Sequence, residues 1–132
     1  MKNFTLEIDG DGIALVTFDS PGKSMNVISA DVMDDFVELT EKVKTDDAIK
    51  GVVITSGKSA FCAGADLSEL GGGSSEMAEL PEDEMKAKLF EQCYRLNKTL
   101  RELETCGKPI AAAINGLALG GGCEIATACH SR

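Results

Sequence analysis

The first eighteen residues have a hydrophobic pattern typical of β-strands. Residues 4–9 alternate between apolar and polar side chains, and residues 13–18 form a continuous apolar run. The Asp9-Gly10-Asp11-Gly12 segment between them has the composition of a tight turn. The pattern therefore predicts a β-hairpin at the start of the chain.

Two later segments follow a helical period instead. Ser29 is a suitable N-cap for a helix whose apolar positions Val32, Phe36, Leu39 and Val43 are spaced by four, three and four residues. A longer helix is predicted from about residue 83 to residue 105. Its apolar stripe, which we expect to be core, consists of Met85, Leu89, Cys93, Leu96, Leu100 and Leu103.

Two more apolar runs complete the pattern, at residues 51–55 and 110–114, and both are predicted as buried strands. Strands alternating with helices predict an α/β fold with a largely parallel sheet. A glycine- and serine-rich stretch followed by acidic residues predicts a flexible loop over about 71–84, which we expect to rim a ligand site.

Length and composition indicate one domain, or one piece of a domain. No apolar run reaches the roughly 18 residues of a membrane span, and the first residues do not resemble a signal peptide. We expect a soluble cytoplasmic protein with no membrane partner.

The net charge and the histidine and cysteine content limit which ligands the protein is expected to bind. The net charge of −9 argues against nucleic acid, so an anionic ligand would have to be held by local donors. His130 is the only histidine, which argues against a metal site. The five cysteines contain no C-x-x-C pair and are expected to be reduced, buried thiols.

The spacing of the glycines does not match the known nucleotide-binding motifs. Two Gly-Lys-Ser triplets, at residues 22–24 and 57–59, lack the upstream glycine of a P-loop, because Thr17 and Val52 occupy that place. The glycines at 116–122 miss the dinucleotide fingerprint, because the third glycine would fall on Ile125.

Two glycine-rich segments, at residues 60–67 and 115–126, each follow a predicted strand. The second has a triple glycine that opens a helix, where free N–H groups and the helix dipole favour a developing negative charge. Glu124 lies three residues after Gly121 and thus on the same helical face. An acid/base beside such donors indicates proton transfer, although the glycines could serve only the turns and Glu124 only the helix dipole.

The segments AFCAGADL (60–67) and NGLALGGGCE (115–124) resemble the two signature segments of the crotonase (enoyl-CoA hydratase/isomerase) superfamily, in the same order and at a similar separation. Residues 21–28 are similar to the early loop in hydratase domains of multifunctional fatty-acid oxidation proteins. The resemblance covers nearly the whole chain. It implies the N-terminal part of a crotonase-like β-β-α spiral, incomplete at the C-terminus, and an acyl-CoA thioester as substrate.

The resemblance also implies roles for individual residues. The backbone N–H groups of Ala65 and Gly121 would form an oxyanion hole, and Glu124 matches the first of two glutamates that add water across the 2,3 double bond. The second glutamate would lie about twenty residues further on, beyond Arg132. The coenzyme A groove would involve Lys23, Met25, Asn26, Ala63, Gly64, Ala65, Asp66, Leu67 and Gly120. Coenzyme A belongs to the substrate and no separate cofactor is implied; the family's homo-oligomers are built on trimers.

Several alternatives stay open. A Δ3,Δ2-enoyl-CoA isomerase would use the same oxyanion hole, and an incomplete piece could bind acyl-CoA without catalysis, leaving an apolar sheet edge and helix face uncovered. Asp66 is more often a helix cap than a base. For Cys62 and Cys123 a packing role is favoured over nucleophilic catalysis, because no histidine is nearby to form a thiolate pair.

Overall fold

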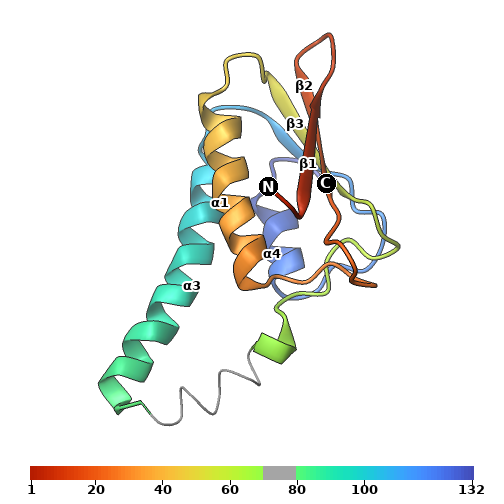
Figure 1. The fold of residues 1–132 in the computed structure, drawn as a ribbon. Helices are drawn as coiled ribbons and strands as arrows, with labels where there is room; N and C mark the ends of the chain where they lie inside the picture. Colours follow the sequence, from red (N-terminus) through yellow and green to blue (C-terminus); the bar gives the residue numbers. More distant parts are fainter. Residues whose placement is uncertain (70–79) are drawn as a thin grey trace.

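The computed structural model describes residues 1–69 and 80–132 of the chain. Its elements follow the chain as β1 (Phe4–Ile8), β2 (Ile13–Phe18), α1 (Ala30–Thr45), β3 (Gly51–Ser56), α3 (Glu82–Glu104), β4 (Ile110–Ala112) and α4 (Gly121–Ala128). The predicted order of strands and helices is confirmed, and Figure 1 shows the helices gathered on one side of the sheet.

The N-terminal hairpin forms as its pattern predicts. β1 pairs antiparallel with β2, placing Phe4 opposite Phe18 with their rings stacked at a centroid distance of 4.6 Å. In the turn, the Asp9 carboxylate accepts the N–H groups of Asp11 at 2.9 Å and Ile13 at 2.8 Å. Gly12 takes a φ of +86°, which an L side chain rarely adopts.

The remaining strands extend the hairpin into one four-stranded sheet of order β1-β2-β3-β4, in which β2, β3 and β4 run parallel. Parallel strands end at the same edge of a sheet. The loops that follow β2, β3 and β4 therefore start side by side, which is where α/β proteins bind ligands.

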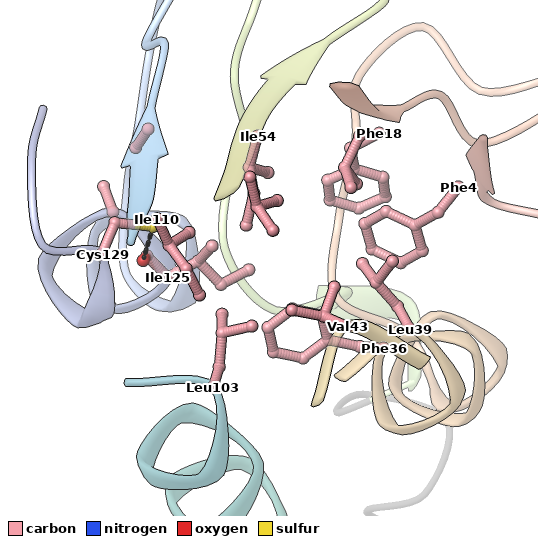
Figure 2. Close-up of a cluster of buried hydrophobic side chains, with 14 of the residues drawn as sticks. Phe4, Phe18, Phe36, Leu39, Val43, Ile54, Leu103, Ile110, Ile125 and Cys129 are labelled. Atoms are coloured by element: carbon pink, nitrogen blue, oxygen red, sulfur yellow. Dashed lines mark hydrogen bonds between the residues drawn. The ribbon is translucent and has the colours of Figure 1, made fainter. Parts of the chain in front are cut away.

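Helix α1 covers the sheet with the predicted face. The Ser29 hydroxyl accepts the Val32 N–H at 3.4 Å, which caps the first turn. Phe36 and Leu39 are buried against the strands, in one cluster with Phe4, Phe18 and Ile54 (Figure 2). Removing a buried Phe side chain from such a cluster costs about 3–5 kcal/mol.

Helix α3 departs from its prediction in two ways. It begins at Glu82, so the flexible loop expected over 71–84 is wrong from residue 82 on, while the part up to residue 79 lies outside the described residues. Acidic side chains at residues 82–84 favour the helix because they lie at the positive end of its dipole.

The apolar stripe of α3 is only half buried, so the expectation that all of it is core is wrong. Leu100 and Leu103 pack into the core, whereas Leu89 is 40% exposed and Cys93 is exposed. The N-terminal half of α3 extends past α1 and α4 (Figure 1), and Leu89 and Phe90 in this half are exposed among the described residues. Within the described ranges, no helix combines the length and apolar character needed to cross a membrane.

Strand β4 ends at Ala112, two residues earlier than predicted. Beside it, the Ala112 N–H donates to the Ser131 carbonyl at 2.8 Å. His130 is exposed, as expected, yet its Nδ1 accepts the Ile110 N–H at 3.0 Å and its Nε2 lies 3.0 Å from the Glu104 carbonyl. The ring therefore links the start of β4 to the end of α3, a role that sequence analysis missed.

Candidate functional site

Three loops meet at the carboxyl edge of the parallel strands: residues 19–29 after β2, residues 57–66 after β3, and residues 113–120 after β4 (Figure 1). Backbone hydrogen bonds join the second loop to both others. The Ala63 N–H donates to the Asn26 carbonyl at 2.8 Å, and the Cys62 N–H donates to the Leu117 carbonyl at 3.1 Å. The two glycine-rich segments are therefore neighbours in the fold.

Ala65, in the second loop, forms an isolated parallel β-bridge with Ile28. The Ile28 N–H donates to the Gly64 carbonyl at 2.8 Å, and the Asp66 N–H donates to the Ile28 carbonyl at 3.0 Å. In a parallel pairing of this kind, the residue between the two bonded neighbours turns its own N–H the other way. Within residues 1–69 and 80–132, the Ala65 N–H has no protein acceptor.

Gly121 supplies a second N–H at the start of α4. The Gly122 N–H donates to the Leu119 carbonyl at 2.8 Å and the Glu124 N–H to the Gly120 carbonyl at 3.0 Å, while the Gly121 N–H makes no hydrogen bond to the described part of the chain. This N–H also lies at the positive end of a helix dipole.

The backbones that precede the two N–H groups are in direct contact. A Cβ built on Gly64 would lie 3.1 Å from the Leu119 carbonyl oxygen, and one built on Gly120 would lie 3.7 Å from the Gly64 Cα. Both glycines also have positive φ, +89° and +47°. Ala65 and Gly121, each the next residue along its segment, are thereby brought together.

Glu124 is exposed on the side of α4 that faces α3. It lines an open hollow of about 350 Å³ together with Asn97, Leu100, Arg101, Glu104, Thr127 and Ala128. A Cβ on Gly121 would lie 3.9 Å from the Leu96 Cδ2, so Gly121 faces α3 as well. The predicted shared face of Gly121 and Glu124 is therefore present.

Lys23 and Asp66 form an ion pair with an Nζ to Oδ2 distance of 2.5 Å across a second hollow, of about 370 Å³, to which the half-exposed Met25 also contributes. The hydrogen bond from Lys23, and then those from Ser68, lower the pKa of Asp66 to about 2. The Ser68 N–H donates to Asp66 Oδ1 at 3.0 Å, which is the capping contact expected of Asp66. Leu67 points outward and is 77% exposed.

Comparison with known proteins assigns the family. The model of the family Enoyl-CoA hydratase/isomerase matches residues 9–132. The chain belongs to the enoyl-CoA hydratase/isomerase family.

Relatives and solved structures agree with this assignment. The chain is 41% identical to the fatty acid oxidation complex subunit alpha of Shewanella amazonensis over 99% of its own length. Its structure superposes over 97% of its length on an enoyl-CoA hydratase from Bacillus anthracis (TM-score 0.74, 24% identity). It superposes over 98% of its length on an enoyl-CoA hydratase from Shewanella pealeana (TM-score 0.79, 18% identity). These likenesses establish the crotonase fold. The chain spans 17% of the curated relative and 45% of each of these two structures.

In the first of the three loops, Asn26 has a role that sequence analysis missed. Its side chain is fully buried rather than facing a groove. Oδ1 accepts the Ser20 N–H at 3.0 Å, and Nδ2 donates to the Phe18 carbonyl at 2.7 Å and to Ser56 Oγ at 2.9 Å. An asparagine among apolar neighbours was the available signal, because a polar group there needs internal partners.

The cysteines correct another expectation. Cys62 and Cys129 are buried, but Cys93 and Cys123 are exposed, so the prediction of buried thiols is wrong for these two. Burial raises the pKa of the Cys62 thiol, which disfavours its thiolate form. All five cysteines are free, and the described residues hold no cluster of three or more side chains suited to a metal ion.

Proposed function

We propose that this chain carries the first half of an enoyl-CoA hydratase site of fatty-acid oxidation. In this proposal the thioester oxygen of a 2-enoyl-CoA accepts hydrogen bonds from the N–H groups of Ala65 and Gly121. The single observation that carries it is that these two N–H groups, side by side in the fold, have no acceptor within residues 1–69 and 80–132.

The chemistry follows from the placement of the two donors. Addition of water at C3 makes the thioester an enolate, whose oxygen carries most of the new negative charge. Donors fixed in advance at that oxygen stabilise the enolate more than the substrate, and each is worth about 3–4 kcal/mol. Because both donors belong to the backbone, their strength depends on loop geometry and not on side-chain identity.

Glu124 is the proposed base that takes a proton from the attacking water. Its position one turn after Gly121, on the same face of α4, supports this role. An exposed carboxylate at this place can exchange protons with water without a buried relay.

Coenzyme A is proposed to lie over the hollow between residues 22–27 and residues 66–68, next to Met25. Lys23 is the proposed cation that binds one of the coenzyme A phosphates. A local cation is needed because the net charge of −9 would otherwise repel an anionic ligand. Asp66 is paired with Lys23 in the structure, so it would compete with the phosphate, and phosphate binding should draw the Lys23 ammonium away from Asp66.

A second candidate function is an acyl-CoA-binding piece that assembles with other copies or chains and does not catalyse alone. The exposed stacked pair of Phe90 and Tyr94 on α3 favours it, because such side chains are common at protein interfaces. Under either function we propose a homo-oligomer, and sedimentation velocity would measure it.

Hydration of crotonyl-CoA, followed by loss of the enoyl thioester absorbance, tests the proposal. We expect turnover that falls about 10²- to 10⁴-fold in Glu124→Gln and is unchanged in Glu91→Gln, which neutralises an exposed carboxylate on α3. Bound acyl-CoA without turnover would favour the second candidate function. Turnover that survives Glu124→Gln would contradict the role of Glu124.

A further inference from the structure

We propose that Ile28 is the positioning residue that sets the separation of the Ala65 and Gly121 N–H groups. The inference rests on the proposed function, because the separation matters only if one oxygen is held by both donors. Ile28 reaches both of them, Ala65 through its backbone and Gly121 through its side chain.

The backbone of Ile28 fixes the Ala65 peptide. Its N–H is bonded to the Gly64 carbonyl at 2.8 Å and its carbonyl to the Asp66 N–H at 3.0 Å, so both of its polar groups hold the immediate neighbours of Ala65. With these two bonds made, the Ala65 N–H can only point away from Ile28.

The side chain of Ile28 fills the space beside Gly121. A Cβ built on Gly121 would overlap the Ile28 Cδ1 and would lie 3.6 Å from its Cγ1. Gly121 does not have a positive φ, so its backbone would accept alanine. The Ile28 side chain is therefore the obstacle to a larger residue there, and it meets the start of α4 at van der Waals contact.

Ile28 can act as a spacer because it is held firmly itself. Two residues earlier, the fully buried Asn26 is bonded to the ends of β2 and β3. A β-branched side chain is also stiff at χ1, which fixes Cγ1, the carbon from which Cδ1 reaches Gly121. Residues 26–28 are thus anchored to the sheet and fix the positions of the Ala65 and Gly121 N–H groups relative to it.

The first experiment separates donor geometry from simple binding. The affinities of coenzyme A and butyryl-CoA would be measured for the wild type, Ile28→Val and Ile28→Ala, together with the infrared carbonyl stretch of bound butyryl-CoA carrying 13C at the thioester carbon. We expect coenzyme A to bind all three within about twofold, because it lacks the carbonyl. The preference for butyryl-CoA should fall roughly tenfold in Ile28→Ala, with the carbonyl stretch returning toward its value in water. Ile28→Val should lie between them.

The second experiment needs no ligand. Gly121→Ala should lower the Tm by a few degrees in the wild-type background and by less in the Ile28→Val background, because valine lacks the overlapping Cδ1. Gly122→Ala is the matched control. Its Cβ would lie 2.5 Å from the Cys62 carbonyl oxygen, so Ile28→Val should not rescue it.

The two experiments distinguish the possible failures. Equal destabilisation by Gly121→Ala in both backgrounds, or an unchanged butyryl-CoA preference in Ile28→Ala, would overturn the role of Ile28. A wild type that binds butyryl-CoA no better than coenzyme A, with an unshifted carbonyl, would overturn the proposed function and the inference with it. Rescue of Gly121→Ala by Ile28→Val would still establish the contact in that case.

Discussion

The two glycine-rich segments depend to different degrees on hydrogen bonds and on missing side chains. Residues 60–67 are held by hydrogen bonds that come from other parts of the chain, chiefly from Asn26 and Ile28. Residues 115–122 share two backbone hydrogen bonds with Cys62, but they depend more on missing side chains, since Gly116, Gly120 and Gly122 each approach the backbone of residues 59–64. The first segment should therefore fail when a side chain is removed elsewhere, and the second when a side chain is added to it.

The largest effect should come from Asn26→Ala. The substitution leaves the buried Ser20 N–H without a partner, at about 1–3 kcal/mol. It also removes one hydrogen bond each from the Phe18 carbonyl and Ser56 Oγ, which keep other partners, at about 0.5–1.5 kcal/mol each. We expect the free energy of unfolding to fall by about 3–5 kcal/mol, measured by urea denaturation. Asn97→Ala, on the surface of α3, is the control and should stay within about 0.5 kcal/mol of wild type. Similar losses in the two variants would contradict the role of Asn26.

An intermediate effect is expected when a methyl group is added to the second segment. A Cβ on Gly116 would overlap the Ser59 carbonyl oxygen, which is backbone and cannot rotate away. Gly116→Ala should lower the free energy of unfolding by about 1–3 kcal/mol in the same assay. Gly10→Ala, in the hairpin turn with no atom within 4 Å of the new methyl group, should have little effect. If Gly116→Ala were as harmless as Gly10→Ala, the second segment would not be placed by close approach.

The smallest effect concerns the Lys23–Asp66 pair, which ties the first segment to the loop after β2 on its solvent side. Asp66→Asn removes the charge but can still cap the turn at residues 67–69. The hydrogen bond from Lys23 lowers the pKa of Asp66 from 3.8 to about 2, so its contribution to stability is present above about pH 4 and is lost as the pH falls toward 2.

Urea midpoints of wild type and Asp66→Asn should therefore differ slightly at pH 7 and converge between about pH 4 and pH 2. Asp31→Asn, at an exposed pair with Lys2, serves as the control. A difference between wild type and Asp66→Asn that persists unchanged at pH 2 would show that Asp66 acts through its shape and not its charge.

The same contrast explains how much the sequence alone could predict. The hairpin, α1 and the order of elements follow from local periods and caps, such as the spacing from Val32 to Val43, and the structure confirms them. The family resemblance was carried by the glycine segments and is confirmed as well. The role of Asn26 and the ring contacts of His130 depend on residues distant in sequence, which periodicity does not encode.

The same holds for the stripe on α3. Its spacing is equally regular in both halves, but only the half that meets α1 and α4 is buried. Apolar spacing predicts a face and does not say what covers it.

The most direct test of the central proposal is a comparison of two ligands by 15N–1H NMR on this chain. Butyryl-CoA and coenzyme A differ by the thioester carbonyl, so a hydrogen bond to that oxygen should appear only with the first. The account predicts downfield proton shifts of the Ala65 and Gly121 amides with butyryl-CoA and not with coenzyme A. Equal responses to both ligands, or a response of neither amide, would contradict it.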